Sequence, residues 1–394
     1  MNKIFFLLIF VFTNSFGQNL DIDSLKIGAS AIINSNHKSI QITAIDKMLI
    51  KEKRIITVFN SDGLSYIDAH QLYNKNISIK DISVTIISPS GKELKKIKKK
   101  DFKDYSATNS STFVSDDRIL ALSYTPTEYP FTAIIESEVE YKTTAFIPRW
   151  LPVTGYDLAI IKDEFELTNT SGIKLNFKEN NLDKYVKVNK RFQENYINYS
   201  VENVSVLDKE NMMPSALNIL PYVDFSLETF ELEGVKGEAK DWSAFGKWMY
   251  QDLLIESNDL PQQTKDKMNK LVEGIENPIE KAKKVYEYVQ NTKRYISIQL
   301  GIGGWKPMKA SEVDKLGYGD CKALTNYTKA LLEAVNIPSY YTVVYGSSGE
   351  KKDIQPDFVA MQGNHVILTM PYNGQNYFIE CTSQTSPLTY KSNF

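Results

Sequence analysis

Three residues near the end of the chain carry side chains that together can perform nucleophilic acyl transfer. Cys321 follows Asp320, a residue type that caps helix N-termini, and an apolar pattern of helical spacing begins directly after it. The partial positive charge at such a helix end favours the thiolate, which is the nucleophilic form of cysteine. A base is then required, and among the three histidines only His365 follows the cysteine, 44 residues further on.

The segment around His365 predicts a hairpin that brings a carboxylate to the histidine. The sequence YNGQ at residues 372–375 separates two apolar runs, and Asn-Gly is the strongest short hairpin signal. A two-residue loop places His365 across from Thr382 and diagonal to Glu380, whereas a four-residue loop places His365 directly opposite Glu380. Either loop puts the histidine and the carboxylate on one face. Cys321, His365 and Glu380 are therefore predicted to act as nucleophile, base and orienting acid.

Two other interpretations of Cys321 stay open. In an exported protein a Cys321–Cys381 disulfide can form, and closing that loop contributes roughly 4 kcal/mol in the chain-entropy model. However, Cys381 follows Glu380 in a strand and points to the opposite face, so both residues cannot face the same site. The remaining interpretation is a small buried residue without chemistry.

The elements that must position these residues are predicted to be mainly helical from Gly234 onward. Trp242–Leu254 and Pro261–Glu273 have helical spacing, and Asn277 followed by Pro278 is a typical helix start. The glycine-rich stretch LGIGGWKP is interpreted as a loop. A helix follows Asp320, then a strand (YYTVVYG), then the hairpin.

The first half of the chain predicts strands separated by turn signals and without intervening helices. That pattern is typical of an antiparallel β-sandwich. The predicted strands are Arg54–Asn60, Ile82–Ser88, Ala133–Tyr141, Asp163–Asn169, Ile173–Lys178 and Tyr196–Val204.

The C-terminal motifs resemble a known family. YGDCKALTNYTKALLEAVNIPSY, NHVIL and YFIECTSQ are similar to the bacterial transglutaminase-like superfamily, and the similarity covers about Pro261 to the end. The resemblance implies an α+β, papain-like core with Cys321 as nucleophile, His365 as base and an acid at Glu380. The family usually has aspartate at that last position. The chain also departs from the family's common Gly-Asp-Cys-Lys-Asp pattern, because Ala323 stands at the position of the second acid.

The N-terminal part resembles the domain of unknown function 3857 through RIITVFNSDG, ISPSGKEL and FVSDDRILAL, which implies a sandwich fold but no activity. The expected organisation is multidomain. Family members commonly continue with a further β-rich region, whereas this chain ends fourteen residues after Glu380, so the core is expected to be either complete or truncated at its C-terminus. The expected parts are a signal peptide (1–17), an all-β antiparallel sandwich (22–233), a helical linker (234–260) and the transglutaminase-like core (261–394).

These features predict an exported acyl transferase or amide hydrolase that forms a thioester on Cys321, with an amine or water as acceptor and a protein or peptide amide as substrate. Trp305 and Tyr318 are candidates for lining the wall of the site or for donating a hydrogen bond to the oxyanion. The alternative for both is that they are aromatic residues packed in the core. The rival function is a non-catalytic protein- or glycan-binding module that retains the fold. The net charge of -2 does not suggest a nucleic-acid partner, and two cysteines with three scattered histidines give no metal-ligand spacing or cofactor site.

The first residues predict export. One lysine, an apolar run from Ile4 to Phe12 and the small residues Ser15 and Gly17 are typical of a cleaved secretory leader. The run is too short to span a bilayer, and no other stretch is long enough.

We therefore expect the mature protein to begin at or near Gln18, because signal peptidase cleaves after small residues such as Gly17. N-terminal sequencing or the intact mass of secreted protein measures this directly. Full-length chain recovered from a membrane fraction with its first twenty residues attached would contradict the prediction.

Overall fold

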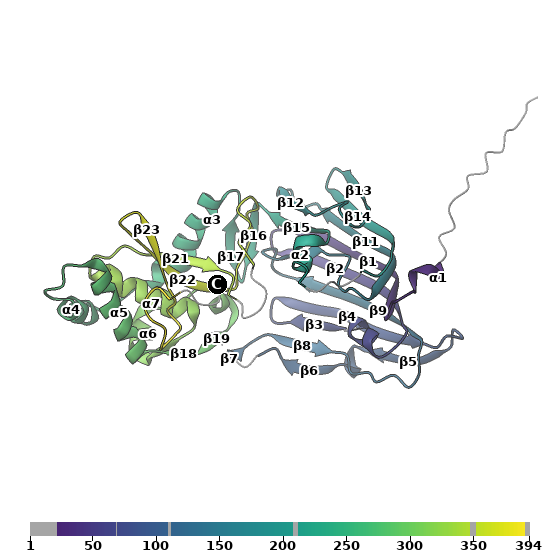
Figure 1. Ribbon diagram of the computed structural model, residues 1–394, viewed down its shortest axis with the longest axis horizontal. Helices are drawn as coiled ribbons and strands as arrows, with labels where there is room; N and C mark the ends of the chain where they lie inside the picture. Colours follow the sequence, from purple (N-terminus) through teal and green to yellow (C-terminus); the bar gives the residue numbers. More distant parts are fainter. Residues whose placement is uncertain (1–21, 68, 109–111, 208–211, 347–351, 391–394) are drawn as a thin grey trace, which may run out of the picture.

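The computed structural model describes residues 22–67, 69–108, 112–207, 212–346 and 352–390, so the predicted leader lies outside the described residues. Figure 1 shows a β-rich N-terminal half and a mainly helical C-terminal half placed end to end along the long axis of the molecule. For description, residues 22–233 are called the N-terminal region, 234–260 the connecting segment and 261–390 the C-terminal region.

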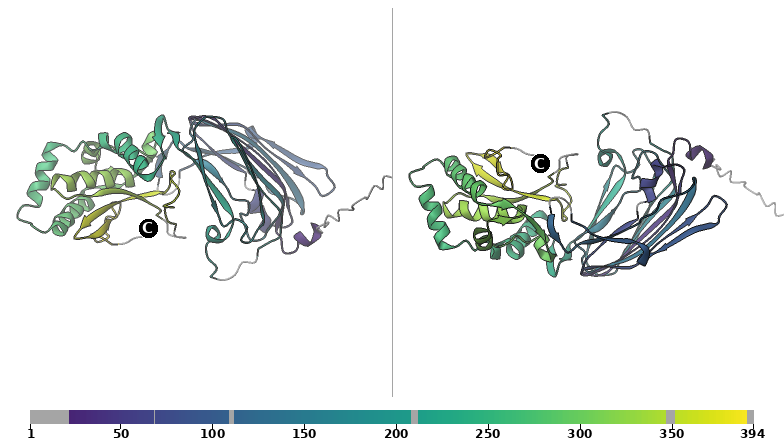
Figure 2. Two further views of the ribbon diagram at one scale, coloured as in Figure 1. Left: turned by 90° about the horizontal axis from the view of Figure 1, so that it is seen from above. Right: turned by 90° about the horizontal axis from the view of Figure 1, so that it is seen from below.

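A twisted eight-stranded sheet forms the body of the N-terminal region (Figure 2). Every neighbouring pair in it is antiparallel except β1 and β11, which run parallel. In sheet order the strands are β13 (Val188–Gln193), β14 (Tyr196–Val204), β11 (Leu158–Asn169), β1 (Ala31–Ala44), β2 (Lys47–Val58), β9 (Phe131–Tyr141), β4 (Ile77–Ile87) and β5 (Glu93–Lys98). The lysine-rich β5 is an edge strand of this sheet, as charged edge strands often are.

Two smaller antiparallel sheets share the hydrophobic core of the large one. The first contains β10 (Ile147–Trp150), β15 (Tyr222–Leu227) and β12 (Leu175–Asn180). Its Phe225 stacks on Phe165 of β11, with ring centroids 5.1 Å apart. The second contains β3 (His70–Tyr73), β8 (Arg118–Ala121) and β6 (Lys103–Ser106). The predicted antiparallel β architecture of this region is confirmed, although β1 and β11 run parallel within the described strands.

The connecting segment begins inside a hairpin rather than at a helix. Strands β16 (Thr229–Leu232) and β17 (Val235–Glu238) pair with each other, and α3 (Trp242–Trp248) continues as a π-helix over Met249–Leu254. Their apolar side chains form a separate aromatic cluster that also contacts the C-terminal region. Buried members include Phe230, Phe245 and Trp248.

The C-terminal region packs helices against a small antiparallel sheet. The helices are α4 (Gln262–Leu271), α5 (Pro278–Thr292), α6 (Ala310–Leu316) and α7 (Cys321–Ala334), and the sheet order is β21 (Tyr340–Val344), β22 (His365–Tyr372) and β23 (Gln375–Ile379). The predicted start of α5 is confirmed, since the Asn277 side chain accepts the Ile279 N–H at 2.8 Å. An α+β C-terminal region therefore follows the β-rich one, as expected.

Helix α7 is the centre of this region. The side chains predicted to form its apolar face, Leu324, Tyr327, Leu331 and Val335, are all buried. Asn336 ends the helix with a positive φ of 59°. Because neighbouring elements cover most of its surface, α7 presents its first residue, Cys321, at a well-supported position.

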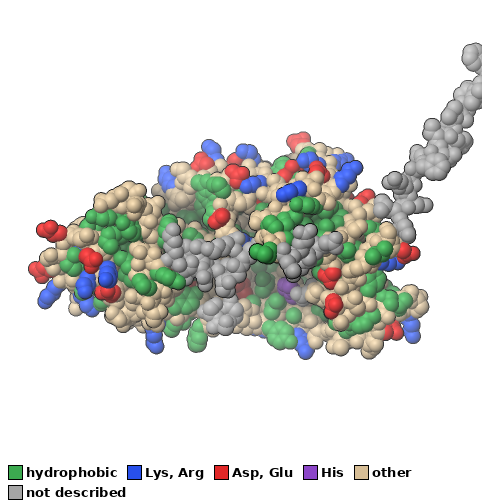
Figure 3. All heavy atoms as spheres, viewed as in Figure 1, with side chains coloured by type: hydrophobic (Ala, Val, Ile, Leu, Met, Phe, Trp, Pro, Cys, Tyr) green, Lys and Arg blue, Asp and Glu red, His purple; other side chains and the backbone are tan. Residues whose placement is uncertain are grey.

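On the face seen in Figure 3, positive and negative side chains are interspersed rather than gathered into a patch of one sign. Among the described helices, none combines the length and the apolar character needed to cross a bilayer.

Candidate active site

Cys321 is the first residue of α7, and the backbone around it is held on both sides. The Asp320 side chain caps the helix by accepting the Ala323 N–H at 2.9 Å, as the sequence predicts. Before the cap, Gly319 packs so tightly on Ala323 that an added Cβ would lie 2.7 Å from the alanine Cβ. Cys321 is 9% exposed. The sulfur therefore lies at a helix N-terminus, in a backbone setting that tolerates little change.

The hairpin brings His365 and Glu380 together in the register predicted for a two-residue loop. Asn373 and Gly374 both have positive φ, 50° and 73°, and the ladder runs from the residues flanking them to Leu368 and Ile379. His365 Nε2 then lies 2.7 Å from Glu380 Oε2. Because Glu380 occupies Nε2, Nδ1 is the ring nitrogen left for the sulfur of Cys321.

The Glu380 carboxylate is buried and each of its oxygens has a partner. Oε2 contacts His365, while Oε1 accepts the Thr382 N–H at 2.9 Å and the Thr382 hydroxyl at 2.6 Å. Tyr286 of α5 donates its hydroxyl to the Glu380 carbonyl at 2.9 Å. Burial raises the pKa of Glu380, but the hydrogen bonds and charge of His365 and the bonds from Thr382 outweigh it and lower the pKa overall. Glu380 is thus held as an anion in one orientation.

His365 is held in its charged form by its two neighbours. Burial lowers the pKa of the ring, but hydrogen bonds to Cys321 and Glu380, together with the charges of both groups, raise it to about 10. An imidazolium between two acidic groups is the arrangement expected for a thiolate–imidazolium pair oriented by a carboxylate. The structure therefore brings Cys321, His365 and Glu380 into one cluster.

Cys381 lies outside that cluster. Its side chain is 4% exposed and belongs to the hydrophobic core formed by α7 and the hairpin. Burial raises the pKa of its thiol to about 12. Both cysteines are free, so the alternative Cys321–Cys381 disulfide is absent from the described residues.

The two aromatic candidates have different surroundings. Trp305 packs on Phe146 of the N-terminal region, with ring centroids 4.9 Å apart, and belongs to the aromatic cluster of the connecting segment. Tyr318 lies in the short strand β20 (Tyr318–Gly319), which pairs with β18 (Arg294–Tyr295) just before the cap. Tyr318 is therefore close to Cys321 along the chain, whereas the contacts of Trp305 are those of core packing.

Four residues near Cys321 were not predicted from the sequence. Burial and the charge of Cys321 raise the pKa values of Tyr295 and Tyr341, which places both phenols within electrostatic reach of the sulfur. Buried Lys322 pairs with the Asp320 carboxylate. Gln299 also donates to that carboxylate, at 3.1 Å. A period-two pattern, Tyr295-x-Ser297-x-Gln299, is the only local signal that would have grouped two of them on one face.

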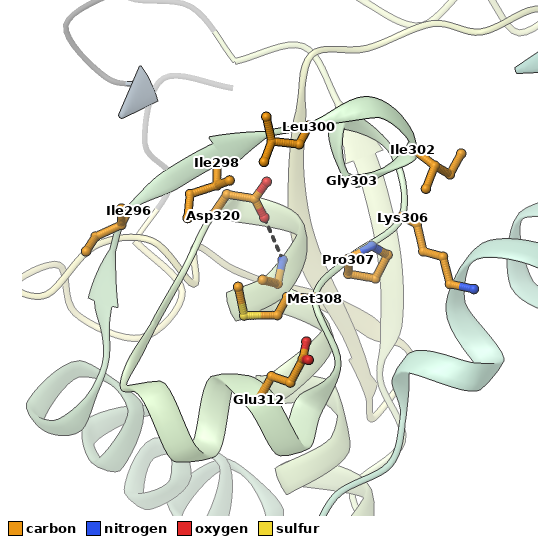
Figure 4. A pocket seen from close by; sticks show the side chains of 11 residues that line it. Ile296, Ile298, Leu300, Ile302, Gly303, Lys306, Pro307, Met308, Glu312 and Asp320 are labelled. Atoms are coloured by element: carbon orange, nitrogen blue, oxygen red, sulfur yellow. Dashed lines mark hydrogen bonds between the residues drawn. The ribbon is translucent and has the colours of Figure 1, made fainter. Parts of the chain in front are cut away.

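A pocket of about 300 Å³ adjoins the cap of α7 (Figure 4). Side chains of Ile296, Ile298 and Leu300 form one wall, while Met308 and Glu312 lie across from them. Asp320 and Ala323 contribute from the helix end, but Cys321 is not among the lining residues. Within the described ranges, no group of three or more His, Cys, Asp or Glu side chains is placed to hold a metal ion.

The raised pKa of His365 leads to a prediction. At pH 8 the ring should still carry both protons, because its pKa is about 10 instead of the ordinary 6.5. The stability that this proton contributes is complete below about pH 6.5 and is lost as pH rises through 10. Ring ¹⁵N NMR shifts against pH measure the titration, and Glu380→Gln should lower the pKa. A neutral His365 ring in the wild type at pH 8 would contradict the assignment.

Comparisons with known proteins agree with this architecture. Residues 47–205 match the model of DUF3857, a domain of unknown function, and residues 265–378 match that of the transglutaminase-like superfamily. No curated protein matches the chain.

The fold is shared with a protein from Parabacteroides distasonis ATCC 8503 described as a putative protease. The two are 14% identical with a TM-score of 0.63, over 91% of this chain and 68% of that one. A putative cysteine protease from Cytophaga hutchinsonii is 12% identical over 85% of this chain and 76% of that one, with a TM-score of 0.24 from which nothing is inferred. The two family models thus match successive parts of the architecture, DUF3857 in the β-rich N-terminal region and the transglutaminase-like superfamily in the α+β C-terminal region.

Proposed function

We propose that the protein cleaves an amide bond by acyl transfer through a thioester on Cys321. One observation carries the proposal: His365 lies 2.7 Å from the Glu380 carboxylate, and Cys321 at the start of α7 contributes with Glu380 to the raised pKa of the ring. A nucleophile, a base and an orienting acid in contact are the requirements of this chemistry.

The steps follow from that contact. The Cys321 thiolate attacks the amide carbonyl carbon, and the carbonyl electron pair moves onto oxygen. When the C–N bond breaks, His365 gives its proton to the leaving amine and the acyl group stays on sulfur. Water or a second amine then attacks the thioester, His365 takes the proton of that acceptor, and the sulfur leaves as thiolate. Glu380 keeps the ring oriented throughout.

The helix end supports the charge that develops on the substrate oxygen. The first N–H groups of a helix have no partner within it and point outward from the N-terminus. The N–H of Cys321 is therefore the natural oxyanion donor, and the aligned peptide dipoles of α7 favour a negative charge there. The phenols of Tyr295 and Tyr341, both under the influence of the Cys321 charge, are the candidates for a second donor.

A peptide or protein amide is the proposed substrate, and the protein is proposed to act after export. The structural relative from P. distasonis is described as a putative protease, which supports an amide substrate through the shared fold alone. Hydrolysis and transfer to an amine use the same thioester, so the acceptor is a property to be measured. The rival function, a binding module that keeps the fold, requires that Cys321 be unreactive.

Thiol trapping tests the proposal. Wild-type protein should alkylate quickly near neutral pH at one cysteine, because a helix N-terminus and a neighbouring imidazolium are surroundings that favour a reactive sulfur. Intact mass after brief treatment with iodoacetamide measures this, and Cys321→Ala is expected to abolish the adduct. A fluorescent primary amine added with a peptide substrate separates transfer from hydrolysis. Alkylation of Cys321 no faster than of an unfolded thiol would support the binding module instead.

The orienting role of Glu380 gives a further prediction. Glu380→Gln should lower the alkylation rate and turnover by roughly 10²–10⁴-fold, since the imidazolium loses its anionic partner. Glu380→Asp should lower them less, because the charge survives while the reach shortens. Alkylation rate against pH is the measurement, with thermal melts to verify folding.

Cys381→Ala is the matched control for this series. The Cys381 thiol lies in the core on the other side of the hairpin, so its loss should leave reactivity unchanged and reduce stability by about 1 kcal/mol. The assigned roles would be refuted if Glu380→Gln alkylated as fast as the wild type while Cys381→Ala lost its reactivity.

A further inference from the structure

A short strand beside the proposed site takes its partner from the N-terminal region. Strand β19 (Ser297–Gln299) belongs to the C-terminal region, yet its ladder partner in the described structure is β7 (Thr112–Ser115), which runs parallel to it (Figure 1). The contact extends beyond the strands. Asp116 donates its N–H to the Gln299 carbonyl at 3.3 Å, and its carboxylate accepts the Gly301 N–H at 3.2 Å.

Strand β7 is in turn fixed to the sandwich. The carboxylate of Asp117, two residues after β7, accepts the Asn74 amide at 2.7 Å, and its carbonyl accepts the Ala107 N–H at 3.0 Å. A strand of three residues makes too few hydrogen bonds to hold its own position. The N-terminal region therefore helps to hold β19, together with the Ile296 N–H that bonds the Gly319 carbonyl at 3.0 Å just before the strand.

The side chain of Gln299 connects β19 to the helix that carries the nucleophile. Its Nε2 lies 3.1 Å from Asp320 Oδ2 and 3.0 Å from the Ser297 hydroxyl, and its Oε1 lies 3.4 Å from Lys322 Nζ. Asp320 is 6% exposed, and its other oxygen, Oδ1, caps α7. A buried carboxylate must keep its donors to remain in place as an anion. Removing Gln299 thus loosens the residue directly before Cys321.

We propose that Gln299 is a positioning residue for Cys321 and that strand β7 of the N-terminal region holds it in place. The inference rests on the proposed function for its effect on reactivity. Its structural part, the fixing of the first turn of α7, is independent of catalysis. The N-terminal domain would accordingly be part of the active site's support and not only an appended module.

The N-terminal region also supports the segment that leads to the base. The Asp224 carboxylate of β15 accepts the Gln355 amide at 2.8 Å, and the Ser226 hydroxyl donates to the Val359 carbonyl at 2.9 Å. This segment precedes His365 by a few residues. Contacts from one region thus reach both the cysteine side and the histidine side of the site.

Replacement of Gln299 tests the proposal. Gln299→Leu keeps the approximate volume but removes the side-chain bonds to Asp320 and Lys322, so the maximal alkylation rate of Cys321 should fall at least tenfold and its pH profile should shift. Asp116→Ala, which removes the carboxylate that accepts the Gly301 N–H, should change the alkylation rate and its pH profile in the same direction as Gln299→Leu but by a smaller factor. Asp116→Asn retains an acceptor oxygen and should restore the wild-type profile. Gln71→Leu, a glutamine of β3 bonded within the N-terminal region, should change neither.

Amide hydrogen exchange gives a readout that does not need activity. Peptides that cover residues 318–326 should exchange at least tenfold faster in Gln299→Leu and in Asp116→Ala than in the wild type and Gln71→Leu. If Gln299→Leu does not fold, the comparison of Asp116→Ala with Asp116→Asn tests the proposal in its place. Unchanged exchange and an unchanged alkylation profile in these variants would overturn the proposal. An unreactive wild type with the expected exchange pattern would refute the proposed function alone.

Discussion

The buried carboxylate of Asp320 is the group on which the geometry around Cys321, the proposed nucleophile, depends. Its two oxygens have separate tasks, since Oδ1 caps α7 through the Ala323 N–H while Oδ2 accepts from Gln299 and pairs with Lys322. A buried anion is stable only with its donors in place. The same bonds that satisfy Asp320 therefore hold the first turn of α7, which begins at Cys321.

A separate feature, the hairpin, positions His365, the proposed base. His365 and Glu380 lie on adjoining strands of one hairpin, and a turn with two positive φ angles sets their register. Glutamate has one more methylene than the aspartate that is usual in the family. The structure accommodates this length because the carboxylate reaches His365 with one oxygen while the other is held by Thr382 two residues further on. The imidazole is consequently oriented by local hairpin geometry, whereas the backbone at Cys321 is held by helix capping.

The capped N-terminus of α7 and the hairpin are both supported by contacts from the N-terminal and the C-terminal regions. The C-terminal region contains Cys321, His365 and Glu380, but β7 pairs with its strand β19, and β15 contacts the segment before His365. The aromatic cluster of the connecting segment adds a third contact, in which Trp305 packs on Phe146. Support from several directions suits the proposed pair of Cys321 and His365, because the reactivity of such a pair depends on a well-aligned contact.

Much of the site could be predicted because its signals are local. The cap at Asp320, the start of α5 at Asn277 and the Asn-Gly turn each lie within a few residues of the structure they specify. Once the turn length is known, the alternation of side chains in a strand places His365 with Glu380 and turns Cys381 into the core. The resemblance to the transglutaminase-like superfamily rests on those same short segments.

Three long-range contacts have no comparable local signal in the sequence. They are the pairing of β7 with β19, the parallel pairing of β1 with β11, and the electrostatic influence of Cys321 on Tyr341. Each joins segments far apart in the chain, and such pairings form only when burial over the whole fold compensates the entropy of closing the intervening loop. The sequence by itself therefore determined which residues are candidates for the proposed chemistry and how each is held locally. Only the tertiary structure decided which distant strand supports them, because that choice depends on the packing of the entire chain.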